Sequence, residues 1–280
     1  MTVPDHETPD NGGFDQHVAY SARVNNFWQG GKDNFSADRA AGIEALEAFP
    51  QLPAALRAGV AFRERAVRFL TGEGIRQFLD LGCGMPAGDP VHALAQAAAP
   101  ESRVVYVDSD PMVIRHAQAL YSSSPKGACG FVHGDVLDYQ RVVAEAAKTL
   151  DFDEPVAVLM ASLLHLIPAD DDAYGLVSAV RSTMAPGSFL LIVHPSSDIR
   201  PQESRQMEAR LNDLVAQKRA YRDRAQVSKF FATLDLAPPG VVGVPAWRPD
   251  SDFAAAAPTM AWCGVGRKPL PGLVIADSKG

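Results

Sequence analysis

The stretch that most constrains the fold runs from Gln77 to Pro111, QFLDLGCGMPAGDPVHALAQAAAPESRVVYVDSDP. It predicts four elements in order: a buried strand over 77–81, a glycine turn at 82–84, a helix over about 87–98 and a second strand over 104–108. Glycine lacks a Cβ, so the backbone of this turn can bend sharply and approach a ligand closely. In an open α/β sheet such loops form the ligand crevice at the carboxyl ends of the strands. The stretch therefore predicts a nucleotide-type site.

Asp108 ends the second predicted strand, where its carboxylate is placed to accept both hydroxyl groups of a ribose. The turn Gly82-Cys83-Gly84-Met85-Pro86-Ala87 also fits the weak G-x-G-x-x-G/A fingerprint of dinucleotide sites. Two residues favour S-adenosyl-L-methionine (SAM) over NAD. Asp80 would repel a pyrophosphate but could bind the ammonium group of a methionine, and Pro86 lacks an N–H that a pyrophosphate would need. An NAD-dependent oxidoreductase stays open as an alternative.

Composition disfavours several other classes of protein. The 280 residues are 47% hydrophobic and 21% charged, as in globular proteins, and can form one large core or two smaller ones. The net charge of -7 gives no support for nucleic-acid binding. Three scattered cysteines indicate neither a disulfide framework nor a metal site. The polar N-terminus is unlike a secretory signal, and no apolar run approaches the ~20 residues of a membrane span, so we expect a cytoplasmic protein without a membrane partner.

An aromatic segment precedes the glycine turn. Residues 17–39, HVAYSARVNNFWQGGKDNFSADR, gather four aromatic side chains around a Gly-Gly turn, beside charged and amide groups. One interpretation is an amphipathic helix over 21–28 that packs on the main domain and is capped by glycine. The other is a lid that closes over the cofactor, with Arg23 or Lys32 binding the cofactor's carboxylate. The residues alone do not decide between these interpretations.

Several segments resemble one known family. SARVNNFWQGGKDNFSADRAA is similar to the N-terminal signature of an actinobacterial family of SAM-dependent methyltransferases formerly catalogued as a domain of unknown function. FLDLGCGMP, RVVYVDSDPMVIRHAQAL, FVHGDVLD, LDFDEPVAVLMASLLHLIP and FFATLDLAPPGVVGVPAWRPD agree with it, so the resemblance covers about residues 20–268. Cys83 departs from the small polar residue usual in the family's turn. We therefore interpret Cys83 as a neighbour of the cofactor and not as a nucleophile.

The resemblance implies an α/β fold of the class I, Rossmann-like methyltransferase type. Its seven-stranded sheet is mostly parallel with an antiparallel last strand, and an N-terminal helical cap covers one sheet edge. Helical spacing over 36–70, interrupted by Pro50 and Pro53, indicates two helices in this cap. Further expected strands are 128–133, 155–164, 187–194, 241–244 and 259–265, and further expected helices are 112–121, 199–229 and 230–236. The expected domains are a tail over 1–16, a cap or lid over 17–72, a SAM-binding domain over 73–268 and a tail over 269–280.

The strand ends indicate further contacts with the cofactor. Asp135 falls where these methyltransferases place an acid that accepts a hydrogen bond from the adenine amino group, although aspartate is also a common helix N-cap. Ala161 and Ser162 follow a buried apolar run and would lie beneath the sulfonium. The candidate cofactor-binding residues are Tyr20, Arg23, Lys32, Asp80, Gly82, Cys83, Gly84, Asp108, Ser109, Asp135, Val136, Ala161 and Ser162.

His165 is the leading candidate for a catalytic base, with a structural hydrogen bond as its alternative role. His194 ends the next strand on the same rim and could face the substrate. Methyl transfer from a sulfonium needs a base only when the acceptor starts protonated, so no catalytic motif is obligatory. The resemblance implies a SAM-dependent methyltransferase that acts on a small-molecule acceptor, without a metal or a nucleic-acid partner. A SAM-binding module without turnover is the second alternative.

Overall fold

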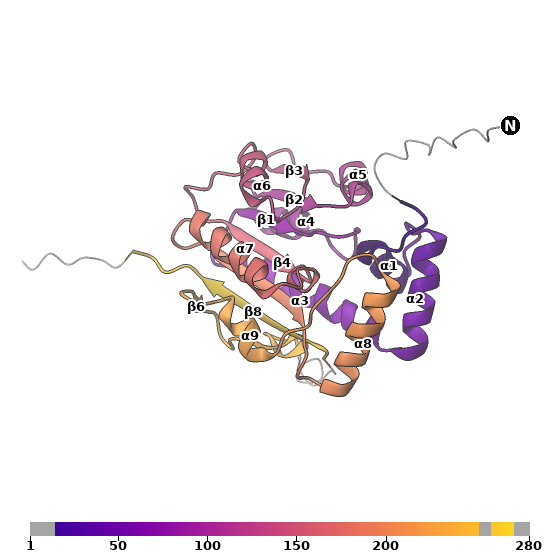
Figure 1. Ribbon diagram of the computed structural model, residues 1–280. Helices are drawn as coiled ribbons and strands as arrows, with labels where there is room; N and C mark the ends of the chain where they lie inside the picture. The colour runs from indigo at the N-terminus through magenta and orange to yellow at the C-terminus, as the bar shows by residue number, and fades with distance from the viewer. Residues whose placement is uncertain (1–14, 252–258, 272–280) are drawn as a thin grey trace, which may run out of the picture.

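One sheet forms the centre of the protein (Figure 1). A computed structural model describes residues 15–251 and 259–271. The strands are β1 (Gln77–Leu81), β2 (Arg103–Asp108), β3 (Ala128–His133), β4 (Ala157–Ala161), β5 (Phe189–Pro195), β6 (Asp235–Leu236), β7 (Val242–Gly243) and β8 (Ala261–Arg267). The path β3-β2-β1-β4-β5-β8-β6 has parallel neighbours up to β5, and β8 is antiparallel to both β5 and β6. The expected seven-stranded fold is confirmed, and the short β7 is an additional strand beside β8.

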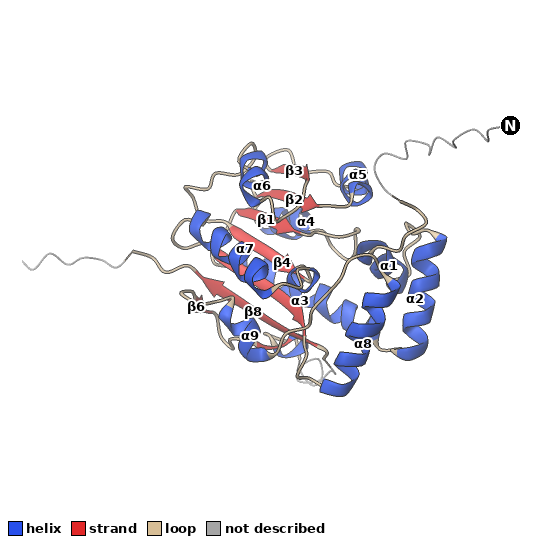
Figure 2. Ribbon diagram, in the orientation of Figure 1, coloured by secondary structure: helices blue, strands red, loops and turns tan. Residues whose placement is uncertain are grey.

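Side chains that alternate along the strands create one core on each face of the sheet. On β5, Leu190 and Ile192 point to one face, while Leu191 and Val193 point to the other. The first face packs against α6 (Tyr139–Ala146), α7 (Asp170–Thr183) and α9 (Arg224–Lys229), and the second against α3 (Leu52–Gly72) and α4 (Val91–Ala98). Figure 2 shows helices on both sides of the sheet, and α5 (Pro111–Leu120) lies against β2 and β3. Within the described ranges, no helix is both long and apolar enough to cross a membrane.

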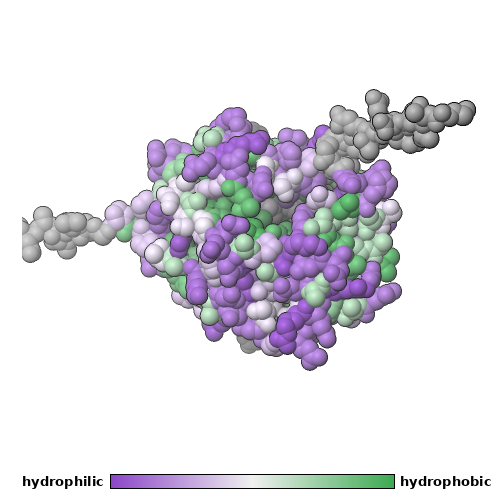
Figure 3. Space-filling model, in the orientation of Figure 1, coloured by the Kyte–Doolittle hydropathy of each residue, from purple (hydrophilic) through white to green (hydrophobic). Residues whose placement is uncertain are grey.

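A helical cap lies at the carboxyl ends of the parallel strands (Figure 1). It consists of α1 (Ser21–Trp28), α2 (Ser36–Ala48) and α8 (Pro201–Leu214), and it has an apolar cluster of its own that includes Val24, Ala45, Met207 and Leu211. In Figure 3, hydrophilic residues cover α8, and hydrophobic ones gather over α2, where Ile43 is 51% exposed. The cap thus joins helices from both ends of the chain.

Two helices expected in the N-terminal region are present, α2 and α3. The expectation that both cap a sheet edge is wrong for most of α3: its first turns, with Leu52 and Leu56, join the apolar cluster of the cap, but its Phe62, Val67 and Leu70 pack on the sheet face beside α4. The helix expected from residue 87 begins at Val91. Gly88 has a left-handed φ of +63° in the intervening loop, and Pro90 occupies the N-cap position.

Two helices expected near the C-terminus differ from the structure. The single helix over 199–229 is instead α8, an extended return over 215–223, and α9. Val215 leaves the helix with φ -123° and ψ 151°, and a capping box formed by Asp223 and Gln226 starts α9. The helix over 230–236 is a turn followed by β6, because Thr233 adopts a left-handed φ of +70°. The apolar run 155–164 is β4 followed by the short helix η1 (Leu164–Leu166).

Candidate active site

The glycine turn after β1 is held against the end of β2. The backbone N–H groups of Gly82 and Cys83 both donate to the Val107 carbonyl oxygen, at 2.8 and 3.0 Å. Gly82 and Gly84 have φ values of +68° and +67°, which glycine adopts without strain. A Cβ on Gly82 would lie 2.7 Å from Leu163 Cδ1, whereas the Cβ position of Gly84 is open. The turn therefore leaves room above Gly84 that a ligand can enter.

Asp108, the last residue of β2, contacts this turn. Its Oδ2 accepts a hydrogen bond from the Gly84 N–H, and its Oδ1 accepts one from the Asp110 N–H, both at 2.9 Å. The residue lines a cavity at the carboxyl ends of the strands and is 9% exposed. Burial raises the pKa of Asp108 to about 6, and hydrogen bonds from the backbone N–H groups of Asp110, Gly84 and Ser109 oppose this shift. A carboxylate has about four lone-pair sites, so this group can still accept hydrogen bonds from a ligand.

The loops after β2 and β3 form the next part of the cavity wall. Ser109, Asp135 and Val136 line it, and Val136 also belongs to the core. Asp135 is exposed, and its Oδ1 accepts a hydrogen bond from the Leu137 N–H at 2.9 Å. The N-cap residue of α6 is Asp138, so the alternative interpretation of Asp135 as a helix N-cap is wrong. Its carboxylate remains available to a ligand.

The end of β4 forms the floor of the cavity, where Ala161 and Ser162 lie. Ser162 has a φ of +64°, a left-handed conformation that is uncommon for a residue with a side chain. Its N–H donates to the Val193 carbonyl oxygen of β5 at 3.0 Å, which holds the chain in this conformation. Such strain is typical of functional sites.

Burial shifts the ionisation of two groups near the turn. The pKa of Asp80 is raised to about 6 by burial, while Arg63 lowers it and Asp108 raises it further. The pKa of the Cys83 thiol is raised well above its usual range by burial and by the charges of Asp108 and Asp80. A protonated thiol is a poor nucleophile. This supports the interpretation of Cys83 as a neighbour of the ligand.

Four predicted residues do not line the cavity: Tyr20, Arg23, Lys32 and Asp80. Asp80 is 2% exposed and buried within β1, and Lys32 is exposed to solvent. The Tyr20 ring packs against Arg23, with its centroid 4.7 Å from the guanidinium carbon. The structure therefore does not support direct contacts between these four side chains and the cofactor.

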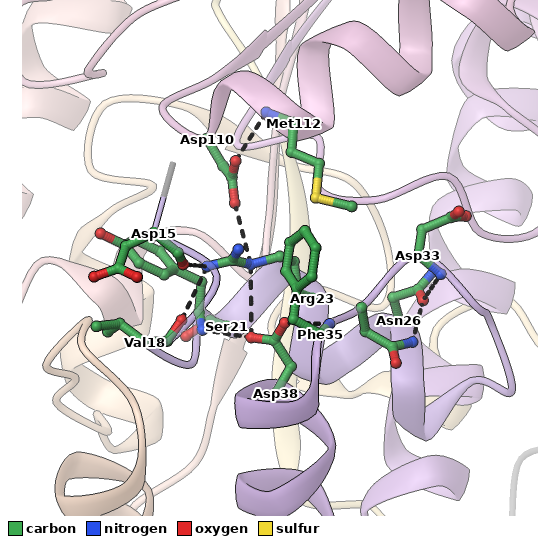
Figure 4. Close-up of polar contacts among 12 residues, drawn as sticks. Asp15, Val18, Ser21, Arg23, Asn26, Asp33, Phe35, Asp38, Asp110 and Met112 are labelled. Atoms are coloured by element: carbon green, nitrogen blue, oxygen red, sulfur yellow. Dashed lines mark hydrogen bonds and ion pairs between the residues drawn. The ribbon is translucent and has the colours of Figure 1, made fainter. Parts of the chain in front are cut away.

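Arg23 is paired with the protein itself (Figure 4). Its buried Nε lies 3.5 Å from Asp38 Oδ1 and 3.7 Å from Asp110 Oδ2, and its Nη2 donates to the carbonyl oxygens of Asp15 and Val18. The expectation that Arg23 binds the cofactor's carboxylate is wrong, because two protein carboxylates already neutralise its charge. The ion pairs join α1 to the first turn of α2 and to the N-cap of α5. The predicted helix over 21–28 is confirmed, and its Ser21 lines the cavity.

His165 lies in η1 and lines the cavity, where it is 7% exposed. Its Nδ1 is buried and has no hydrogen-bond partner in the described chain. Burial is the main cause that lowers the pKa of His165 well below its usual value, and the positive charges of Arg219 and Arg222 lower it further. The ring is therefore neutral at pH 7.

His194 does not face the cavity, so the expectation that it contacts substrate is wrong. Its Nε2 lies 3.0 Å from Arg222 Nη1, and its Nδ1 lies 2.8 Å from the Pro195 carbonyl oxygen. Arginine can only donate, so Nε2 is the acceptor and Nδ1 carries the proton. Burial lowers the pKa of His194 to about 3. Arg222 also donates to the carbonyl oxygens of Leu164 and Ile167, so this buried pair positions η1 and, with it, His165.

The extended return over 215–223 closes the cavity on the cap side. The Ala220 N–H donates to the His165 carbonyl oxygen at 2.9 Å. Gln217, Arg219 and Tyr221 occupy alternate positions of this segment, and all three line the cavity. These residues were not predicted, since a helix was expected there. The alternating pattern Gln-x-Arg-x-Tyr is the sequence signal that indicates them.

The cavity has two halves. The cofactor half is lined by Arg63, Gly82, Cys83, Gly84, Asp108, Ser109, Asp135, Val136, Ala161 and Ser162. The cap half is lined by Ser21, Trp28, Leu52, Leu56, His165, Met207, Leu211, Gln217, Arg219, Tyr221 and Met260. Arg63 was not predicted; its Nη2 donates to the Ala87 carbonyl oxygen at 2.7 Å, and its buried Nε has no partner within the described ranges. Among the described side chains, no group of three or more His, Cys, Asp and Glu is arranged to hold a metal ion.

Comparison with known proteins agrees with this architecture. The S-adenosyl methyltransferase family model matches residues 7–269. A solved DUF574-family protein from Streptomyces avermitilis is 36% identical, with a TM-score of 0.87, over 91% of this chain and 99% of that one. A candidate methyltransferase from Thermobifida fusca is 32% identical, with a TM-score of 0.84, over 94% of this chain and 99% of that one. A search of curated proteins found no match. The chain therefore belongs to the S-adenosyl methyltransferase family, as its sequence resemblance implied, and its cofactor is SAM.

Proposed function

We propose that this SAM-dependent methyltransferase acts on a small-molecule acceptor that binds in the cap half of the cavity. The observation that carries the proposal is the position of Asp108. Its carboxylate lines the cavity, can still accept hydrogen bonds from a ligand, and lies beside the open Cβ position of Gly84. The cap half continues from this point into a space lined by both apolar and polar side chains. A small molecule in that space would lie next to the cofactor.

The strand ends fit the nucleoside part of SAM. Asp108 would accept hydrogen bonds from both ribose hydroxyl groups. Asp135 is exposed in the cavity wall, and its carboxylate would accept a hydrogen bond from the adenine amino group. Ser109 and Val136 line the cavity between these two acids and would contact the ring and the sugar.

The turn and the end of β4 fit the methionine part of SAM. Gly82 and Gly84 allow the backbone to approach it closely. Ala161 and Ser162 would lie beneath the sulfonium. We assign the cofactor's carboxylate to Arg63, in place of Arg23 or Lys32, because its guanidinium lines the cofactor half and its buried Nε lacks a partner.

The bound cofactor supplies a methyl group on a positively charged sulfur, which a nucleophile can displace in line. The protein must then align the acceptor and exclude water. The cap serves both purposes, because the Ser21 N–H donates to Gln217 Oε1 at 2.8 Å and so fastens α1 to the extended return. His165, neutral and held by the Arg222 network, can accept a proton from an acceptor that starts protonated.

Transfer of label from methyl-labelled SAM to the small-molecule fraction of a cell extract tests the proposal. We expect labelled product with the wild-type protein and a strong decrease with Asp108→Ala. Asp138→Ala is the matched control, because Asp138 is exposed, lies outside the cavity and makes no side-chain cap hydrogen bond. Tight cofactor binding without label in any fraction would contradict turnover and favour the SAM-binding module. The family gives no support to an NAD-dependent oxidoreductase.

A further inference from the structure

Arg219 is a buried cation that forms no ion pair with the carboxylates of the described residues. It is 6% exposed, its Nη2 donates to Ser21 Oγ at 2.9 Å, and its side chain is also hydrogen-bonded to that of Tyr221. Its Nε is buried and has no hydrogen-bond partner among the residues that the structure describes. Two other arginines in the described chain are as deeply buried, Arg23 and Arg222, and each has a carboxylate within 4 Å. Arg219 therefore carries a positive charge into the cavity that the surrounding protein does not neutralise.

The groups beside Arg219 are neutral at pH 7. Ser21 and Gln217 have no charge, the pKa of His165 is lowered by burial, and the pKa of Tyr221 is raised to about 12 by burial. Glu208 acts on Arg219 only at longer range, without an ion pair. This part of the cavity thus presents one positive charge, which matches a ligand group with a single negative charge.

Much of the remaining wall of the cap half is apolar, although the polar side chains of Asn25, Gln51 and Thr259 also line the cavity. The apolar part includes Trp28, Leu52, Leu56, Met207, Leu211 and Met260. An occupant of this half would bury an apolar body against these side chains while its charged group reaches Arg219.

The cofactor's own carboxylate has a different partner. Arg63 lines the cofactor half beside the glycine turn, whereas Arg219 lies in the extended return. That return is hydrogen-bonded to η1 through Ala220 and to α1 through Gln217, and η1 and α1 bound the cap half. The position of Arg219 therefore favours the acceptor over SAM.

We propose that Arg219 binds a carboxylate group of the methyl acceptor, so that the acceptor is a carboxylate-bearing molecule with an apolar body. The proposal rests on the proposed function, since it concerns the acceptor half of the same cavity. A planar guanidinium can donate two parallel hydrogen bonds to a carboxylate, and a desolvated site strengthens both. Because Arg219 Nε has no partner among the described residues, the protein does not satisfy every donor of this guanidinium.

Calorimetric titration of the protein loaded with S-adenosylhomocysteine (SAH) tests this proposal. The probes are benzoate, phenylacetate and 2-naphthoate, each compared with its uncharged carboxamide. We expect at least one acid to bind about 10- to 100-fold more tightly than its amide. Arg219→Met should remove this preference and Arg219→Lys should restore part of it. Arg68→Met, on the exposed face of α3, is the matched control and should keep the wild-type preference.

Equal binding of acids and amides by the SAH-loaded wild-type protein would overturn the proposal. A loss of SAH binding in Arg219→Met, with normal binding in Arg68→Met, would also overturn it, because Arg219 would then serve the cofactor. Failure of the wild-type protein to bind SAH would contradict the proposed function itself. The two failures are therefore distinguishable.

Discussion

Replacing Arg23 by methionine removes the cation that joins α1 to α2 and α5 (Figure 4). Two buried carboxylates then lose their counter-charge. Asp38 keeps hydrogen bonds from the N–H groups of Tyr20 and Phe35, whereas the buried Asp110 Oδ2 has no hydrogen-bond partner in the described part of the chain. We therefore expect Asp110 to account for most of the destabilisation.

The size of the effect follows from the geometry. Removing one partner of a buried ion pair costs about 3–5 kcal/mol, and the 3.5 and 3.7 Å separations are longer than a charge-assisted hydrogen bond. We expect a loss of about 3–4 kcal/mol in the free energy of unfolding, or about 6–8 °C in melting temperature. Arg68→Met removes an arginine whose side chain is 55% exposed and 3.8 Å from Glu64. This control should change the free energy by less than about 1 kcal/mol.

Thermal and urea unfolding of the single and double variants provide the assay. Asp110→Asn removes the charge that Arg23 neutralises, so the double variant should be less destabilised than the sum of the single variants, by at least about 1 kcal/mol. Hydrogen exchange of the α1 amides should become faster in Arg23→Met, because α1 loses its attachment to α2 and α5. Additive effects, or an Arg23→Met variant as stable as Arg68→Met, would refute this account of the cap.

Two further predictions concern the turn and the carboxylate beside it. Gly82→Ala imposes a φ of +68° on a residue with a Cβ and places that atom 2.7 Å from Leu163 Cδ1. The free energy of unfolding should therefore decrease by about 1–3 kcal/mol, and SAH should bind more weakly. Gly175→Ala, in open space on α7, should instead stabilise by up to about 1 kcal/mol, and equal melting temperatures of the two variants would argue against the turn's role. The affinity for SAH should decrease as the pH is lowered through about 6, because Asp108 then gains a proton and can no longer accept two hydroxyl hydrogen bonds. Calorimetry should show binding about tenfold weaker at pH 5 than at pH 7. Asp108→Asn should lack this dependence, and a flat wild-type profile would exclude Asp108 as the titrating group.

The sequence predicted correctly those helices and strands that are defined by patterns among neighbouring residues. The strands β1 and β3 and the helix α1 occupy the predicted residues 77–81, 128–133 and 21–28. Each combines a period in hydrophobicity with glycine or charged residues at its end, and both features are local. The positions of Asp108 and Asp135 in the cavity wall follow directly, because the carboxyl ends of parallel strands meet at one edge of the sheet.

The cap could not be predicted because its contacts join distant parts of the chain. Ser21 is hydrogen-bonded to Gln217 and to Arg219, which follow it in the sequence by 196 and 198 residues. The two-residue strands β6 and β7 are too short to show a period. For Arg23, the sequence shows a cation near a predicted site but not its partner. Only the folded chain shows that Asp38 and Asp110 neutralise it.

SAH binding to the Asp108→Ala variant tests the central claim most directly, with Asp138→Ala, at the N-cap of α6, as the control. Losing two hydrogen bonds from ribose hydroxyls to a charged acceptor should cost about 3–5 kcal/mol. Calorimetry should therefore show more than about a 100-fold increase in Kd for Asp108→Ala and a wild-type Kd for Asp138→Ala. A wild-type Kd in Asp108→Ala would mean that the cofactor does not lie across the end of β2.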